Sequence, residues 1–159
     1  MFTLLDPPAS FAGYAAIDPP LVPLPLGAAT ARLGFPSPAE DFEEDSLDLN
    51  RLLIRNAPAT YIYRASGHSM ARAGILDGDL LIVDRSVEPR TGSLVMAVWE
   101  GNQPTCKILL IAENHVELHS ANPEVPPIVI EEGTEVELFS VVSIARQVKR
   151  ASVPRASRS

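Results

Sequence analysis

The sequence has little cysteine and no long uninterrupted apolar run. Its single cysteine, Cys106, cannot form an internal disulfide, which suits a reducing compartment and excludes a small secreted scaffold held together by disulfides. The N-terminus has no basic segment leading into an apolar stretch, and prolines and aspartates interrupt it early. We therefore expect a cytoplasmic protein with no signal peptide and no membrane span.

Positive charge is also scarce, because 13 Lys and Arg oppose 20 Asp and Glu, for a formal net charge of -7. Such a surface is poorly suited to nucleic-acid backbones, which are bound through Lys and Arg, so we expect no direct sequence-specific DNA binding. The C-terminal stretch "ARQVKRASVPRASRS" is the exception, with five basic residues and no acid. We interpret this stretch, and residues 149–159 in particular, as a solvated basic tail.

The 159 residues are enough for one domain with a hydrophobic core and an appended arm. Residues 1–38 contain eight prolines, which break any helical or strand period, and they predict an extended arm. Apolar side chains of this arm, such as Phe11 and Tyr14, would favour lying against a folded body or a partner. A short helix is expected near residues 49–55, with Asp48 as its N-cap, although the acids before it also fit a solvated connector.

The chain from Thr60 onward consists of short β-branched and aliphatic runs separated by turn residues. The runs are "TYIYRAS", "DLLIVD", "SLVMAVW", "TCKILLI", "HVELHS", "PPIVI" and "EVELFSVVSIARQV", and turn signals such as "LDGD" and "EEG" stand between them. This pattern predicts a mostly β domain over residues 39–148, and the continuous apolar runs indicate strands that are covered on both faces.

One turn, "SGHSM", carries a candidate nucleophile, Ser69. A serine hydroxyl needs a neighbouring base, and adjacent His68 is poorly directed for that work. His115 and His119 share a face of their expected strand and could complete a Ser-His-Asp arrangement, but no Gly-x-Ser-x-Gly elbow accompanies them. Surface strand residues are the simpler interpretation of both, and no metal site is expected, because further ligands at a recognisable spacing are lacking.

Lys107 is a second candidate base, because "TCKILLI" places one lysine in an otherwise apolar strand. Burial disfavours the charged ammonium form and so can leave a neutral amine that accepts a proton. The alternative is a surface lysine on an edge strand, whose ammonium group reaches water while its stem covers apolar surface. The local pattern alone favours this alternative.

Taken together, "SGHSM", "LDGDLLIVD" and "TCKILL" resemble the LexA/UmuD family of self-cleaving Ser/Lys peptidases, and specifically its UmuD branch. Three further pieces, "GFPSPAEDF", "LDLNRLLI" and "ELFSVVSIARQV", stand along the chain in the order that the family has them. The resemblance therefore covers about residues 24–148. It implies a curved, mostly β, LexA-like catalytic domain with a long N-terminal arm. It also implies that Ser69 is the nucleophile and that Lys107 is the general base.

The resemblance places the cleaved bond before the glycine of "GFPSP", between Leu33 and Gly34. Backbone amides of His68 and Ser69 are the expected oxyanion donors. No cofactor is implied. Family cleavage sites usually have alanine or cysteine before the glycine, and a leucine in a pocket shaped for a small side chain would cost about 1 to 3 kcal/mol. Cleavage of this chain is therefore expected to be efficient only if the pocket has changed to match.

The resemblance implies an SOS-response function. Self-cleavage would be stimulated by a RecA filament on single-stranded DNA, and the trimmed homodimer would join a UmuC-like Y-family polymerase in error-prone translesion synthesis. A repressor is disfavoured, because the prolines before Gly34 leave no room for a helix-turn-helix. A subunit that stays full-length and regulates the polymerase is the alternative, and a signal-peptidase-like enzyme is weakened by the missing membrane anchor.

Overall fold

The computed structural model describes residues 9–15, 24–26, 45–99, 101 and 103–157. Its strands are β1 (Ser10–Tyr14), β2 (Leu24–Leu26), β3 (Asp45–Leu47), β4 (Thr60–Arg64), β5 (Leu80–Asp84), β6 (Leu94–Trp99), β7 (Thr105–Ile111), β8 (His115–His119), β9 (Ile128–Glu131) and β10 (Val136–Ala145). Helix α1 (Leu49–Leu53) and two short 3-10 helices, η1 (Ala57–Ala59) and η2 (Ala71–Ala73), complete the described elements. The mostly β prediction is confirmed, and each of the seven predicted runs forms a strand.

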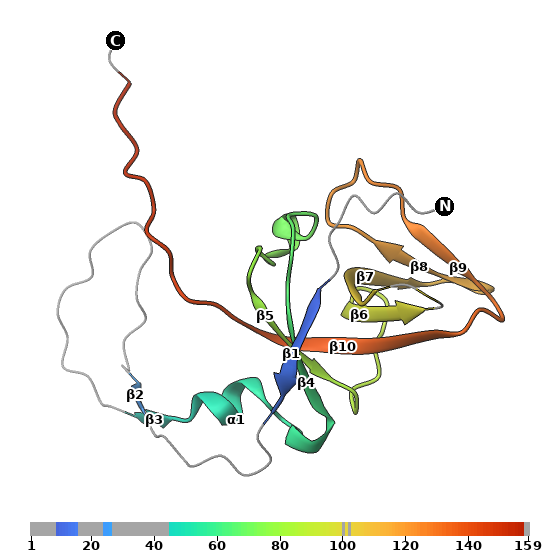
Figure 1. Ribbon diagram of the computed structural model, residues 1–159, viewed down its shortest axis with the longest axis horizontal. Helices are drawn as coiled ribbons and strands as arrows, with labels where there is room; N and C mark the ends of the chain where they lie inside the picture. Colours follow the sequence, from blue (N-terminus) through green and yellow to red (C-terminus); the bar gives the residue numbers. More distant parts are fainter. Residues whose placement is uncertain (1–8, 16–23, 27–44, 100, 102, 158–159) are drawn as a thin grey trace.

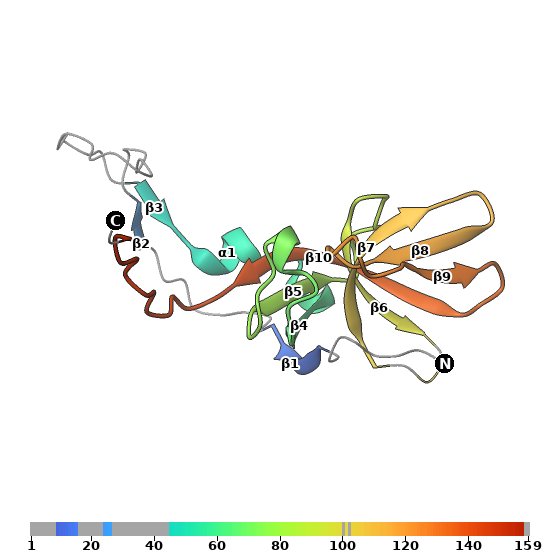
Figure 2. The same ribbon diagram turned by 90° about the horizontal axis from the view of Figure 1, so that it is seen from above.

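Eight strands form one antiparallel sheet in the order β1-β4-β5-β10-β6-β7-β8-β9. Strand β10 is the longest, and its first half pairs with β6 while its second half pairs with β5. The register shifts between Val141 and Ser143, as at a β-bulge, which increases local twist. The sheet is curved as a result, with β1, β4 and β5 at one end and β6 to β9 at the other (Figures 1 and 2).

Two apolar clusters fill this curved sheet. The first joins Met70 and Ile75, from the loop after β4, to strand residues such as Leu81 and Met96. The second, between β6 and β9, contains Val95, Ala97, Leu109, Leu118 and Ile130. Each large aliphatic side chain that is removed from water in this way stabilises the fold by about 1.5 to 3 kcal/mol. The loop after β4 is thus fixed by the first cluster.

The expected short helix is present as α1. Its N-cap is Asp48, whose carboxylate accepts a hydrogen bond from the Asn50 amide at 2.9 Å. This contact satisfies one of the amides that a helix start leaves without a partner. The prediction of the cap is confirmed.

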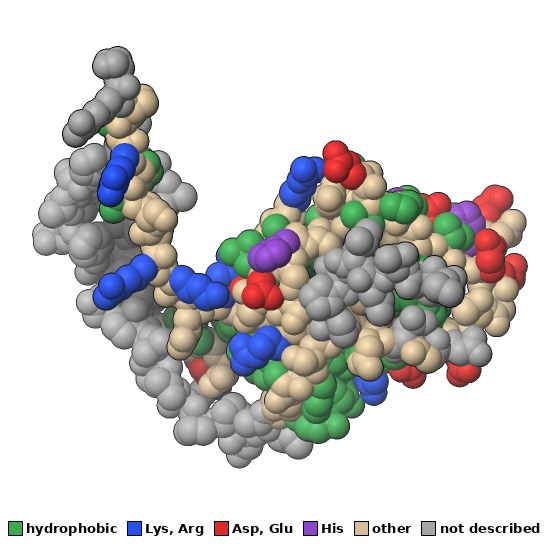
Figure 3. Space-filling model, turned by 45° about the horizontal axis from the view of Figure 1, so that its top comes forward, with side chains coloured by type: hydrophobic (Ala, Val, Ile, Leu, Met, Phe, Trp, Pro, Cys, Tyr) green, Lys and Arg blue, Asp and Glu red, His purple; other side chains and the backbone are tan. Residues whose placement is uncertain are grey.

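The two ends of the chain differ from expectation in part. The proline-rich first 38 residues do not predict strands, yet β1 pairs with β4 and β2 pairs with β3. At the other end, the chain leaves β10 as an extended segment, along which basic side chains stand apart from the sheet (Figures 1 and 3). No described helix has the length and apolar character needed to cross a membrane.

Candidate active site

Ser69 lies on the loop of residues 65–79 that joins β4 to β5. The neck of this loop is closed by two backbone hydrogen bonds of 2.8 Å, from the Ala65 amide to Asp79 and from the Gly78 amide to Ala65. Gly67 has φ +89°, a left-handed conformation that side chains other than glycine rarely adopt, and it makes the sharp turn before the serine possible. The expected role of Gly67 is confirmed.

The two aspartates of "LDGD" accept hydrogen bonds from backbone amides of the same loop. The Gly67 amide donates to the Asp77 carboxylate at 2.9 Å, and the Leu76 amide donates to Asp79 at 2.7 Å. The structural role predicted for this turn is therefore confirmed. Met70, next to the serine, is 5% exposed in the first apolar cluster, so its expected packing role is confirmed as well.

Arg146 fastens the same loop to the end of β10. Its guanidinium donates to the Gly74 carbonyl at 2.6 Å and to the Asp79 carboxylate at 2.9 Å. The Asp79 side chain is only 2% exposed, whereas that of Arg146 is 41% exposed. Arg146, the first cation of the C-terminal basic stretch, is thus exposed to solvent but held against the folded domain.

Lys107 is buried at 5% exposure in β7, opposite Val95 of β6. Strand β7 lies inside the sheet, between β6 and β8. Thr105 and Leu109, two residues away on each side, share its face and are buried too. The alternative of a surface lysine on an edge strand is therefore wrong.

Ser120 links the Ser69 loop to the end of β8. Strand β8 pairs with β7 through His119 and Ile108, and Ser120 follows directly after it. The Ser120 hydroxyl donates to the Ser69 carbonyl at 3.0 Å, and the Ala121 amide donates to the same oxygen at 3.1 Å. The loop that carries Ser69 is therefore attached to the end of β8, which is the neighbour of the strand that carries Lys107.

A small cavity of about 20 Å³ opens at Ser69. It extends to the start of β7 and to the segment before β1. Its lining consists of Ala9, Ala65, Ser66, Gly67, Ser69, Met70, Ile75, Thr105 and Cys106. Such a space holds about one water molecule.

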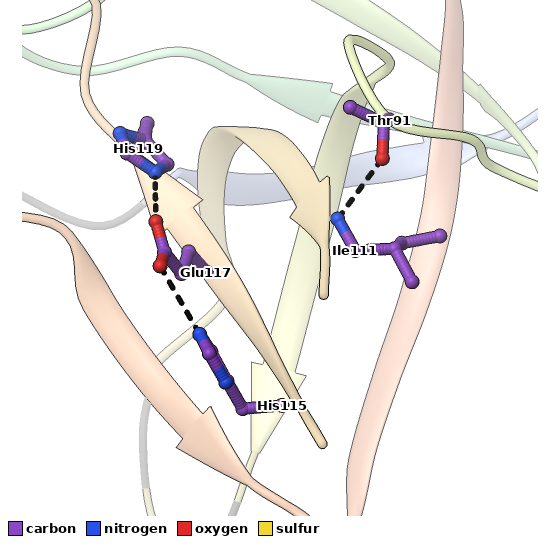
Figure 4. A network of polar contacts seen from close by, with 5 residues as sticks. All are labelled: Thr91, Ile111, His115, Glu117 and His119. Atoms are coloured by element: carbon purple, nitrogen blue, oxygen red, sulfur yellow. Dashed lines mark hydrogen bonds and ion pairs between the residues drawn. The ribbon is translucent and has the colours of Figure 1, made fainter. Parts of the chain in front are cut away.

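His115 and His119 are occupied by a different partner. Both rings contact the carboxylate of Glu117, at 3.1 Å from His115 and 2.6 Å from His119 (Figure 4). These hydrogen bonds, first that of His115 and then that of His119, lower the pKa of Glu117. Across the part of the chain that the structure describes, no group of three or more His, Cys, Asp or Glu side chains is arranged to hold a metal ion.

Replacing both His115 and His119 with glutamine should leave self-cleavage within about twofold of wild type, because their partner is Glu117 rather than the Ser69 loop. Since the pKa of Glu117 is lowered in the folded state, its contribution to stability is present at neutral pH and is lost as pH falls through the folded-state value. Unfolding curves of wild type and Glu117→Gln should thus differ at neutral pH and converge in acid. A large loss of cleavage in the double histidine variant would restore the histidine-base alternative.

The proposed cleavage site, Leu33 and Gly34, lies outside the described residues. The backbone amides of His68 and Ser69 remain predicted oxyanion donors. Three residues around the site have no local sequence signal: Ala9, Ser120 and Arg146 reach it only through strand pairing and long-range hydrogen bonds.

The curved antiparallel sheet, with the serine loop after β4, is that of a LexA-like peptidase domain. The chain belongs to the Peptidase S24-like family, whose model matches residues 25–143. The family inferred from the motifs is therefore confirmed.

Individual relatives agree with this assignment. Protein ImpA of Salmonella typhimurium is 44% identical over 100 residues, which cover 63% of this chain and 69% of that protein. Protein SamA of Salmonella typhimurium strain LT2 is 37% identical over 119 residues, or 75% of this chain and 81% of that protein. The LexA repressor of Clostridium kluyveri is 36% identical over 107 residues, or 67% of this chain and 52% of that repressor.

Proposed function

We propose that this protein is a self-cleaving serine peptidase that cuts its own chain between Leu33 and Gly34. The observation that carries the proposal is the cavity that Ser69 shares with Thr105 and Cys106, the two residues before the buried Lys107 in β7. Membership of the Peptidase S24-like family supports the same chemistry. The described residues offer a serine and a buried amine for acyl transfer, and the proposal requires no cofactor.

In the proposed reaction the neutral amine of Lys107 takes the proton of the Ser69 hydroxyl as its Oγ attacks the Leu33 carbonyl carbon. The backbone amides of His68 and Ser69 stabilise the developing oxyanion. The bond to the Gly34 nitrogen then breaks, and the proton held by Lys107 passes to that nitrogen. Water hydrolyses the remaining ester, which releases the carboxylate of Leu33 and restores the Ser69 hydroxyl.

The UmuD-like motifs, together with the similarity to ImpA and SamA, support a proposal for the biological setting. We propose that a RecA filament on single-stranded DNA stimulates the cut in the cytoplasm during the SOS response. The shortened chain then acts as a homodimer and as an accessory subunit of a UmuC-like Y-family polymerase in translesion synthesis. Residues 1–38 would be the arm that contains the cleaved bond, of which residues 1–33 are removed, and residues 39–148 would be the catalytic domain.

Intact-mass spectrometry tests the cut and the nucleophile together. Purified wild type and Ser69→Ala are incubated at alkaline pH and, separately, with RecA filaments formed on single-stranded DNA. We expect wild type to yield a fragment that begins at Gly34 and Ser69→Ala to remain intact. Intact wild type under both conditions, or the same cut in Ser69→Ala, would contradict the proposal.

A second function is favoured by one observation, the small size of the cavity at Ser69. If the isobutyl group of Leu33 does not fit there, the chain persists at full length and acts as a regulatory subunit of the polymerase. Full-length protein would then remain after DNA damage while still binding the polymerase. Accumulation of the Gly34 fragment would rule this function out.

Leu33→Ala separates the two functions. Relief of overpacking by about 1 to 3 kcal/mol in the transition state corresponds to an acceleration of about 5- to 150-fold. We expect the rate of formation of the Gly34 fragment, followed by mass spectrometry at fixed pH, to rise within this range. An unchanged rate would show that the pocket already accepts leucine.

A further inference from the structure

A side chain from the N-terminal part of the chain forms part of the wall of the cavity at Ser69. Ala9 is 7% exposed and packs in the first apolar cluster with Ala65, Met70 and Ile75. It also lines the cavity together with Ser69. The Ala9 amide donates to the Pro104 carbonyl at 3.0 Å, just before the strand of Lys107. The two contacts fix Ala9 between the serine loop and β7.

The five residues after Ala9 are held as a strand. In β1, Ser10 pairs with Arg64 and Tyr14 pairs with Tyr61, so the segment runs antiparallel to β4 (Figures 1 and 2). The Phe11 ring lies 5.5 Å from the Tyr63 ring and 5.1 Å from the Tyr14 ring, both edge to face. Backbone pairing, one small side chain in a pocket and aromatic contacts are how an extended peptide binds to a sheet edge.

A cleavable segment would need this same place. For Ser69 to attack, its Oγ must approach the reacting carbonyl carbon to about 3 to 3.5 Å. The side chain before the cleaved bond then enters the cavity at the serine. The space left beside Ala9 is about 20 Å³, which is about one water molecule, so Ala9 and a leucine side chain would compete for this position.

We propose that the segment Ala9–Tyr14 is an uncleaved resident ligand of the substrate groove, which competes there with the segment around Leu33. The docking of Ala9–Tyr14 does not depend on the proposed self-cleavage, but its effect on the cleavage rate rests on that proposal. Cleavage requires β1 to leave β4, so the observed rate is the intrinsic rate multiplied by the fraction of molecules with an empty groove. The chain thereby limits its own processing, and whatever displaces β1 accelerates it.

Two substitutions of the same kind test this ligand. Ala9→Phe places a ring where only a methyl group fits, and it should release the strand. Ala12→Phe is the matched control, because Ala12 is exposed and lies at the register shift of β1, outside the cavity lining. Both are made in the full-length chain, and a melting curve checks that each variant folds.

The docking is measured without chemistry, by hydrogen exchange in the uncleavable Ser69→Ala background. We expect Ala9→Phe to accelerate exchange at residues 10–14 and in β4, with β7 and β8 unchanged, and Ala12→Phe to resemble the parent. With Ser69 restored, Ala9→Phe should form the Gly34 fragment on the order of five- to tenfold faster than Ala12→Phe.

Equal exchange in the two variants would overturn the proposal, and so would a fragment that begins at Ser10, because the segment would then be a substrate. Equal cleavage rates in two variants that are both cut would also overturn the competition. Faster exchange in Ala9→Phe with no cleavage of any variant would support the resident ligand and contradict the proposed self-cleavage.

Discussion

Lys107→Met should abolish the serine-dependent cut while leaving the sheet folded. Methionine has nearly the same length as lysine and suits a buried strand position, but it has no atom that accepts the Ser69 proton. Loss of a general base typically costs about 10² to 10⁴ in rate. We expect a loss of this size in the rate of formation of the Gly34 fragment, with a melting temperature within a few degrees of wild type, because methionine fills the same buried volume.

The chain provides its own control, because Lys149, its other lysine, is exposed in the C-terminal segment. Lys149→Met should be cut at the wild-type rate. Lys107→Arg should be as inactive as Lys107→Met, since arginine keeps its proton. In wild type, cleavage without an activator should accelerate as pH rises, because only the neutral amine acts as a base. Activity in Lys107→Met, or a rate that does not change across alkaline pH, would contradict the assignment of the base.

The sequence predicts the strands from β4 to β10 well, because each is a short apolar run between strong turn signals such as "LDGD" and "EEG". The short helix is equally accessible, since Asp48 is a local N-cap signal. Strand β1 is not, because its sequence between two proline clusters has no clear period and its pairing with β4 spans about 50 residues. A strand that is defined by its partner has little signature of its own.

The chemistry of the site divides in the same way. Ser69 stands out because of its turn. The local pattern of "TCKILLI" does not distinguish a buried lysine from a surface lysine, and only the position of β7 inside the sheet shows that Lys107 is buried. Residues that hold the site together carry no local signal. Ser120 contacts Ser69 across 51 residues, and Arg146 contacts Asp79 across 67. Their roles depend on the order of the strands, which a single sequence does not specify.

Arg146→Met is expected to cause the largest loss of stability among the surface-accessible residues of this site. It removes the cationic partner of Asp79, whose side chain is 2% exposed, and leaves that carboxylate with the Leu76 amide at 2.7 Å. Separating a fully buried ion pair costs about 3 to 5 kcal/mol, and solvent screening at Arg146, which is 41% exposed, reduces the expected loss to about 1 to 3 kcal/mol. For a chain of 159 residues this predicts a fall in melting temperature of roughly 2 to 12 °C.

Arg146→Met should also lower the rate of self-cleavage, because the Gly74 carbonyl and Asp79 both belong to the loop that carries Ser69. Arg150→Met removes the same charge from an exposed residue and should change the free energy of unfolding by less than about 0.5 kcal/mol. A double-mutant cycle with Asp79→Asn should give a coupling of at least about 1 kcal/mol, measured by urea unfolding. If Arg146→Met is as stable as Arg150→Met and is cut at the wild-type rate, this ion pair does not hold the serine loop, and the hydrogen bonds from Ser120 and Ala121 to Ser69 position the nucleophile without it.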